Sequence, residues 1–376
     1  MHYELCIKRL KMNKLLPLAA MLALVGCSSG KTGTADATVT DSVTPAQILI
    51  ARLDSASRSG NFYFGHHDDT AYGHTWRYVD GNSDVRSIVG AYPGLMSWDL
   101  GLIEVDSARN LDGVPFEFIA GQIAAQDARG GINAISWHPL NPMTHGGSWD
   151  TSAAPLAALA TDKALSDTLD AWIGRAADFI ASLRDADGNP IAVIFRPWHE
   201  NSGSWFWWGK DHGTPAEYID LWKRTRAGFD KKGVTNVVWA YSPDKDLSRD
   251  EYFSTYPGDE YVDILGTDIY HFDGADGTAR YVSRIKAQLP YVIEEAGKRG
   301  KIAAFTETGL EGLEIPDWYT TVLQPAIKDL PIAYVCVWRN AIESEKPNHF
   351  YVPYPGHPAE ADFKKFAETS GAVFVK

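Results

Sequence analysis

The chain has 376 residues, of which 45% are hydrophobic and 22% are charged, a composition typical of a folded globular protein. Its 48 acidic residues outnumber 35 basic residues, and the net charge of −13 argues against binding of nucleic acid through a basic surface. The length fits either two small domains or one large barrel. The chain also has 13 tryptophans, which serve either a large core or stacking platforms for ligands.

Residues 1–26 have the pattern of a secretory signal peptide. Basic residues up to Lys14 precede the apolar run Leu15 to Gly26, which is too short to span a bilayer. The run ends at Cys27 and is followed by small polar residues, which resembles the lipobox of bacterial lipoproteins. This resemblance implies a lipid anchor on Cys27 in the bacterial cell envelope, at the outer membrane on its periplasmic or surface side. Ordinary secretion is the alternative. We expect residues 27–43 to form a flexible tether.

From residue 44 onward, short apolar runs alternate with segments of helical periodicity, which predicts a parallel sheet covered by helices. Eight predicted strands favour closure into a (β/α)8 TIM barrel. A doubly wound open sheet is the alternative, but no G-x-G-x-x-G motif follows the first strand. The predicted strands are Asn61–Gly65, Leu95–Trp98, Ile132–Trp137, Ile191–Arg196, Val237–Tyr241, Ile264–Thr267, Ile302–Thr306 and Ala333–Trp338. The predicted helices are Ala46–Ser59, Phe116–Ala128, Leu165–Ala186, Pro215–Lys232, Thr278–Arg299, Trp318–Leu330 and Ala359–Ser370.

Nearly every predicted strand ends in polar or aromatic residues. In a parallel barrel these strand ends meet on one face, where the active sites of such enzymes are built. Glu200 and Glu307 end the fourth and seventh predicted strands, and these ends lie across the barrel mouth from each other. Cleavage of a glycosidic bond needs such a pair of carboxylates, because one protonates the leaving oxygen and the other attacks or assists at the anomeric carbon. The pattern therefore predicts an enzyme.

The residues around both glutamates resemble two motifs of glycoside hydrolase family 26. Phe195-Arg196-Pro197-Trp198-His199-Glu200-Asn201 resembles the acid/base motif of that family, and Phe305-Thr306-Glu307-Thr308-Gly309 resembles its nucleophile strand. Similarity extends from about Phe62 to Asn340. The resemblance implies a single (β/α)8 glycoside hydrolase catalytic domain over residues 44–376, with a retaining double-displacement mechanism and activity mainly on β-1,4-mannan.

Carried over to this sequence, the resemblance makes Glu200 the acid/base and Glu307 the nucleophile. We expect apolar surroundings and the negative Glu307 to raise the pKa of Glu200, and positive Arg196 and Arg339 to keep Glu307 ionised. The resemblance also implies substrate-binding roles for seven further residues. The residues that line the glycone subsites would be His138, Asp268, Trp338 and Arg339. Next to the nucleophile would lie His199 and Tyr270, and Trp205 would stack on the sugar on the leaving-group side.

Several readings remain open from the sequence. The substrate is expected to be mannan, galactomannan or glucomannan, cut by endo action, with a mannobiose-releasing exo-enzyme as an alternative. Members of the same family also include β-1,3-xylanases and β-glucanases. Endo or exo action depends on a loop at one end of the cleft, for which the long segment Leu140–Lys163 is the candidate. A surface lipoprotein that binds glycans without cleaving them is the alternative of another class.

The remaining expectations concern metal, cysteine and tryptophan. His66-His67-Asp68-Asp69 offers ligand types, but consecutive residues at a strand end alternate in direction, so we expect no metal and no cofactor. No disulfide is possible in the mature chain because Cys336 alone remains, within a buried strand. We expect a monomer. About half of the tryptophans are expected to line the cleft, namely Trp98, Trp137, Trp198, Trp205, Trp207, Trp208 and Trp338.

Overall fold

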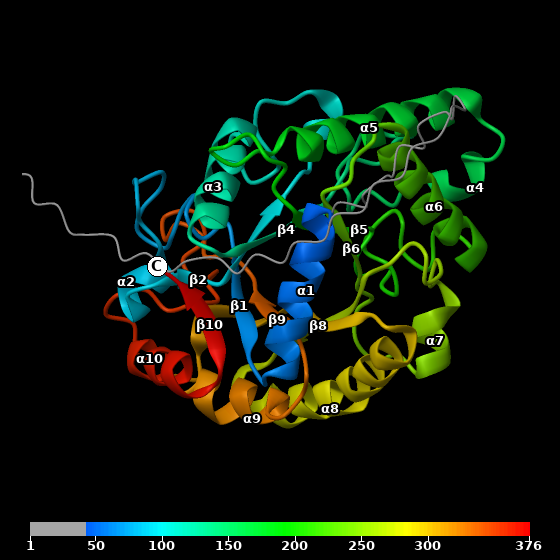
Figure 1. Cartoon of the computed structure of the whole chain (residues 1–376). Helices are drawn as coiled ribbons and strands as arrows, with labels where there is room; N and C mark the ends of the chain where they lie inside the picture. The colour runs from blue at the N-terminus through cyan, green and yellow to red at the C-terminus, as the bar shows by residue number, and fades with distance from the viewer. Residues whose placement is uncertain (1–42) are drawn as a thin grey trace, which may run out of the picture. The chain divides into compact units, whose positions relative to one another are not determined.

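Eight parallel strands close into a barrel in the computed structural model of the chain, which describes residues 43–376 (Figure 1). Each strand pairs with the next, and the last, β9, pairs back with β1. The predicted barrel is therefore confirmed. The predicted signal peptide, Cys27 and the tether up to residue 42 lie outside the described residues. The barrel strands are β1 Phe62–His67, β3 Leu95–Asp99, β4 Ile132–Trp137, β5 Val193–Pro197, β6 Val237–Tyr241, β7 Ile264–His271, β8 Ile302–Leu310 and β9 Tyr334–Val337.

Helices connect the strands and cover the outside of the barrel, where their apolar faces form the larger core with the outward-facing strand residues. The connecting helices are α2 Asp84–Val89, α3 Phe116–Ala128, α4 Pro155–Ala158, α5 Lys163–Ser182, α6 Pro215–Lys231, α7 Arg249–Ser254, α8 Gly274–Arg299, α9 Gln324–Ile327 and α10 Glu360–Thr369. The prediction of a single helix over Trp318–Leu330 was wrong. A π-helical turn, Tyr319–Leu323, precedes α9 there, because Pro325 has no N–H for a regular helical bond.

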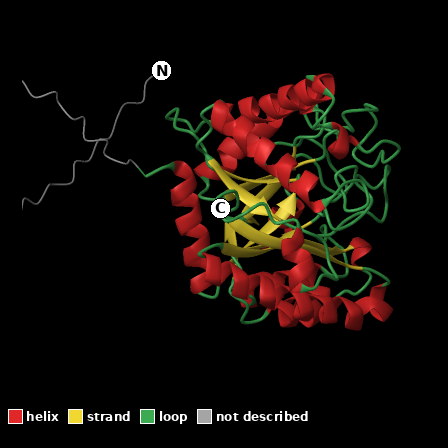
Figure 2. Ribbon diagram, turned by 90° about the vertical axis from the view of Figure 1, so that its right-hand side faces the viewer, coloured by secondary structure: helices red, strands yellow, loops and turns green. Residues whose placement is uncertain are grey.

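The first helix, α1 (Pro45–Arg58), closes the amino-terminal end of the barrel. It begins with a capping box between Thr44 and Gln47, and it buries Leu49 and Leu53 against the inward-facing residues of the strands. Figure 1 shows α1 across this end, and Figure 2 shows the long loops gathered on the opposite side. The carboxyl ends of the strands are therefore the open face of the barrel.

Two short strands were not predicted. β10 (Ala372–Val375) adds in parallel to the start of β1, and β2 (Tyr92–Pro93) pairs antiparallel with β10. They extend the sheet beside the barrel and lie away from its open face. Within residues 43–376, no helix combines the length and the apolarity needed to cross a membrane.

Candidate active site

A cleft of about 380 Å³ lies at the carboxyl ends of the strands and contains both predicted catalytic glutamates. Its volume and mixed aromatic and polar lining are those of a site for a small organic group such as a sugar unit. The lining residues are His138, Trp149, His199, Glu200, Trp205, Phe206, Asp244, Lys245, Tyr270, Phe272, Glu307, Trp338, His349 and Tyr351.

Glu200 lies in a strained turn directly after β5. Trp198 and Glu200 have positive φ angles of 54° and 52°, which residues with a side chain rarely adopt. Buried contacts hold the turn: the Trp198 indole donates to Thr225 at 3.0 Å, and the Glu200 amide donates to the Ser242 carbonyl at 2.8 Å. The surrounding structure thus maintains a conformation that points Glu200 into the cleft.

Glu307 lies within β8 at an irregularity of the sheet. Phe305 pairs with Thr267 but Glu307 pairs with Asp268, so Thr306 is an extra residue on the β8 side. Such bulges re-aim a side chain and are frequent beside active sites. Both strands continue beyond their predicted ends at Thr267 and Thr306, and Glu307, next to the bulge, lines the cleft.

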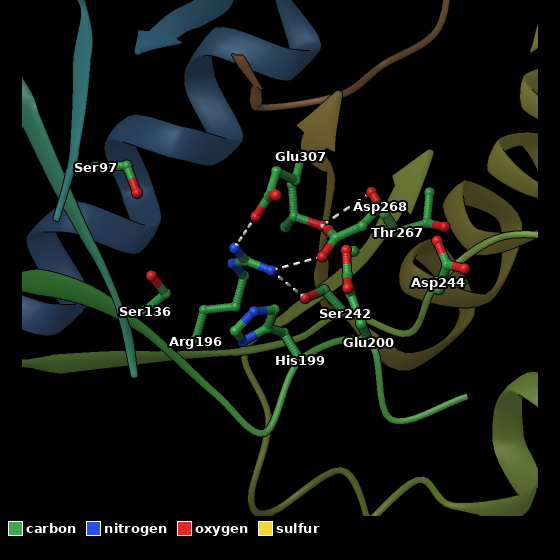
Figure 3. A network of polar contacts seen from close by, with 12 residues as sticks. Ser97, Ser136, Arg196, His199, Glu200, Ser242, Asp244, Thr267, Asp268 and Glu307 are labelled. Atoms are coloured by element: carbon green, nitrogen blue, oxygen red, sulfur yellow. Dashed lines mark hydrogen bonds and ion pairs between the residues drawn. The ribbon is translucent and has the colours of Figure 1, made fainter. Parts of the chain in front are cut away.

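Arg196 is the centre of a buried polar network beneath the cleft (Figure 3). Its Nη2 forms an ion pair with Oε2 of Glu307, and its Nη1 donates to Asp268 at 2.6 Å. Burial alone would lower the pKa of Arg196, but the negative Asp268 and Glu307 raise it above its usual value. Arg196 is therefore a permanent cation. While Arg196 contacts Oε2 of Glu307, the Tyr270 hydroxyl donates to the other oxygen, Oε1, at 2.5 Å.

Glu200 has a different environment from Glu307. Burial raises the pKa of Glu200 well above its usual value, and the negative charges of Glu307, Asp268 and Asp244 raise it further. Its Oε2 accepts a hydrogen bond from the Trp205 indole at 2.8 Å. The raised pKa of Glu200 favours its protonated form, while Glu307 in the same cleft forms an ion pair with Arg196. This pairing can supply an acid and a nucleophile for glycosidic bond cleavage.

Two histidines form the floor of the cleft beside the glutamates. Nδ1 of His138 is 2.7 Å from Oδ2 of Asp99, and Nε2 of His138 is 3.0 Å from Nε2 of His199. Burial and the charge of Arg196 lower the pKa of His199 well below its usual value, so His199 is neutral. Asp99 was not among the predicted site residues, although it ends β3 in the position where such residues were sought.

The structure brings seven of the nine predicted active-site residues to the cleft and leaves two beneath it. Glu200, Glu307, His138, His199, Trp205, Tyr270 and Trp338 line the cleft. Asp268 is fully buried and binds Arg196 and Thr306. Arg339 pairs with Asp112 at 3.0 Å, so only Arg196 of the two expected arginines contacts Glu307.

The expectation for the tryptophans was wrong for five of the seven. Trp98, Trp137, Trp198, Trp207 and Trp208 are almost completely buried and form core beneath the cleft. Trp198, for example, packs at 5.2–5.5 Å from Trp137, Trp207 and Trp208, which supports the turn that carries Glu200. Trp205 and Trp338 do line the cleft.

Several cleft residues come from loops and were not predicted. Trp149, in the long Leu140–Lys163 segment, is 56% exposed and stacks on His138 with ring centroids 5.4 Å apart. Tyr351 packs beside Tyr270, and this contact depends on Gly309, whose φ is +152°. A Cβ at position 309 would lie 2.3 Å from the Tyr351 ring. Gly309 thus leaves the space that the Tyr351 ring occupies beside the cleft.

The comparisons with known proteins agree with this geometry. A sequence model described as glycosyl hydrolase family 26 matches residues 40–319. A mannan endo-1,4-beta-mannosidase of Bifidobacterium adolescentis is 32% identical over 306 residues, which is 76% of this chain and 30% of that protein. One from Bacillus subtilis strain 168 is 30% identical over 234 residues, covering 59% of this chain and 62% of that protein. The chain thus spans less than two thirds of the length of either relative.

Two solved structures of mannanases are also similar to this chain. The chain is similar to a GH26 β-mannanase from Bacteroides ovatus, with 44% identity, a TM-score of 0.85, and coverage of 88% of this chain and 95% of that one. A modular endo-β-1,4-mannanase from Cellulomonas fimi is 33% identical with a TM-score of 0.78, covering 88% of this chain and 75% of that one. The chain therefore belongs to glycosyl hydrolase family 26.

Proposed function

We propose that the chain is a retaining endo-β-1,4-mannanase that acts on mannan, galactomannan or glucomannan. The observation that carries the proposal is the pair of unlike carboxyl groups in one cleft. The pKa of Glu200 is raised by burial and by nearby negative charge, whereas Glu307 forms an ion pair with Arg196. Family membership and the names of the similar proteins support mannan as the substrate.

In the first step, Glu200 protonates the glycosidic oxygen while Glu307 attacks the anomeric carbon. The bond to the leaving sugar breaks, and a covalent glycosyl ester forms on Glu307. Tyr270 and Arg196 hold the two oxygens of Glu307 and orient the nucleophile. Trp205 lies next to the acid and offers a flat ring to the departing sugar.

In the second step, Glu200 acts as a base. Esterification removes the negative charge of Glu307, which is the second largest cause of the raised pKa of Glu200 after burial. The pKa of Glu200 therefore falls once the ester forms, and its carboxylate takes a proton from the attacking water. Hydrolysis of the ester returns both groups to their starting states and retains the β configuration.

Substitution of each glutamate tests these roles. We expect Glu307→Ala to abolish hydrolysis of mannan, and Glu200→Ala to lose far more activity on mannan than on an aryl β-mannobioside whose leaving group needs no proton. Glu368→Ala, an exposed residue on α10, is the matched control. ¹H NMR of the first product should show the β anomer. Wild-type activity in Glu307→Ala would refute the nucleophile assignment, and a first-formed α anomer would refute retention.

Product analysis over time on galactomannan, with xylan and β-glucan in parallel, tests substrate and mode of action together. We expect a spread of manno-oligosaccharides from the first minutes, as endo action requires. Release of mannobiose alone would indicate exo action. Binding of mannan without any product would support the non-catalytic alternative.

We also propose that Cys27 carries a lipid that attaches the chain to the bacterial envelope, and that the protein is a monomer. The lipobox-like residues before and after Cys27 support the anchor. Partitioning of the full chain and of Cys27→Ala into detergent after phase separation tests it, since only the unsubstituted chain should enter the detergent phase. Size-exclusion chromatography with light scattering tests the monomer.

A further inference from the structure

A second group of titratable side chains lies behind Trp338 and takes no part in the proposed mechanism. It consists of His67 at the end of β1, Asp68 directly after it, and Asp112 from the loop between β3 and α3. One potential ligand atom from each residue lies within 4.8 Å of the others. His67 and Asp68 are at most 1% exposed, and the Asp112 side chain is 8% exposed.

Each member has one polar atom held by a neighbour. Nδ1 of His67 lies 3.1 Å from Ser97 Oγ, and Oδ2 of Asp68 accepts from the Tyr72 hydroxyl at 2.5 Å. Oδ1 of Asp112 pairs with Arg339. The second atoms of the first two, Nε2 of His67 and Oδ1 of Asp68, are buried without a hydrogen-bond partner within residues 43–376. Buried polar groups without a partner are rare and require an explanation.

Two carboxyl groups of the cluster, those of Asp68 and Asp112, lie around the guanidinium of Arg339, which pairs directly with Asp112. Burial raises the pKa of Asp68 and of Asp112, whereas burial followed by the charge of Arg339 lowers the pKa of His67. Independently of these shifts, Nε2 of His67 is buried without a hydrogen-bond partner beside the two carboxyl groups, so it is available as a ligand atom.

We propose that Nε2 of His67, together with Asp68 and Asp112, binds one divalent first-row transition-metal cation, with Zn²⁺ the best match. One imidazole and two carboxylates suit Zn²⁺, whereas Ca²⁺ and Mg²⁺ prefer oxygen alone. Ser97, Tyr72 and Arg339 then serve as outer partners that orient the ligands, as in known metal sites.

The role of the cation is structural. The His67 ring stacks on Trp338 at a centroid distance of 4.2 Å and an interplanar angle of 19°, and Trp338 lines the cleft. A metal that holds His67 thus stiffens one wall of the substrate site. The proposal departs from the expectation of no metal, because Asp112 from a separate loop completes a set that His66 to Asp69 could not form alone.

The test uses the full chain without a histidine tag, stripped with EDTA and re-equilibrated with Zn²⁺, Ca²⁺ or Mg²⁺. We expect one Zn²⁺ per chain by elemental analysis and a Tm that rises by several degrees with Zn²⁺ but not with Ca²⁺ or Mg²⁺. His67→Gln should weaken Zn²⁺ binding at least 100-fold and remove the rise in Tm. His212→Gln, outside the group, should behave as wild type.

Asp68→Asn is the second variant, since Asp68 has a φ of +53° and asparagine tolerates that conformation. It too should lose the Zn²⁺-dependent rise. The alternative is that a proton on Asp68, and no metal, occupies the site. In that case Asp68→Asn would leave stability unchanged or raise it, and the wild-type chain would retain no metal. That result, or a Zn²⁺-dependent rise in the Tm of His67→Gln equal to that of wild type, would overturn the proposal. None of these readouts depends on mannanase activity, so the metal test would remain valid even if the proposed function were refuted.

Discussion

The indole N–H of Trp205 donates to Oε2 of Glu200 across 2.8 Å, so the residue proposed to stack on the leaving sugar also orients the proposed acid. Because Oε2 accepts this bond, Oε1 is the oxygen left free to present a proton to the substrate. Trp205 thereby links recognition of the substrate to the direction in which the acid donates. The ring of Trp205 is 37% exposed, which leaves a face available for a sugar.

Trp205→Phe separates the two contributions of this residue. Phenylalanine keeps a flat ring but removes the N–H, so Glu200 loses its orienting bond. One hydrogen bond contributes about 1 kcal/mol, and kcat/KM on mannopentaose should fall roughly fivefold. Trp205→Ala removes the ring as well and should fall further. Equal rates for wild type and Trp205→Phe would show that the hydrogen bond does not orient the acid.

The raised pKa of Glu200 predicts a pH-dependent cost in stability. Burial is the largest cause of the rise, followed by the charge of Glu307. Above the usual value of 4.5, the unfolded chain releases the proton of Glu200 whereas the folded protein retains it. Stability from this group is therefore lost as pH rises from 4.5 toward the raised pKa.

Glu200→Gln removes this cost, since glutamine stays neutral in both states. The variant should match wild type below pH 4.5 and become progressively more stable than wild type above it. Urea unfolding at a series of pH values measures the difference. Glu368→Gln, on the exposed face of α10, controls for loss of an acidic residue and should show no such trend. A difference that is constant with pH would contradict the assignment.

Two neighbouring residues should move the alkaline limb of the pH–rate profile in opposite directions. Asp244 is one of the negative charges that raise the pKa of Glu200, and Lys245 pairs with Asp244 at 2.6 Å. Asp244→Asn should lower the pKa of Glu200 and shift the alkaline limb of kcat/KM to lower pH. Lys245→Met should shift it to higher pH. Shifts in the same direction would indicate a loss of structure instead of an electrostatic effect.

The sequence predicted the barrel because its strands are uniform apolar runs, and it predicted that both glutamates face one cleft because they directly follow or end such runs. Ile132–Trp137 and Val237–Tyr241 have the predicted bounds, since both faces of these strands are buried. The ends of β7 and β8 were not predicted, because their polar residues satisfy each other across the sheet, as Thr306 and Asp268 do at 2.6 Å. Such pairing depends on the register of the bulge, which periodicity does not encode.

The same limit applies to the tryptophans. Trp198 and Trp205 are both tryptophans of the turn and loop after β5, yet one is fully buried and the other is 37% exposed. The two rings have different hydrogen-bond partners. Thr225 of α6 accepts the indole N–H of Trp198, whereas Glu200 in the cleft accepts the indole N–H of Trp205. The direction of the Trp198 ring is set by a partner 27 residues away, and that of the Trp205 ring by a residue of the same loop. Trp149 was missed for a related reason, because the shape of its loop decides whether it reaches the cleft.

Trp149→Ala and Trp207→Ala form a pair that tests this division between cleft and core. Trp149 is 56% exposed and stacks on His138, so its loss should lower kcat/KM on mannan roughly fivefold, at about 1 kcal/mol for an aromatic contact, and leave Tm unchanged. Trp207 is fully buried, and its loss should cost about 3–5 kcal/mol and lower Tm by on the order of 10 °C. Steady-state kinetics below the lower Tm, together with calorimetry, measure both effects. If Trp149→Ala lowered Tm as far as Trp207→Ala does, the exposed ring would support the fold, and its stacking on His138 would have to be read as packing instead of as a sugar platform.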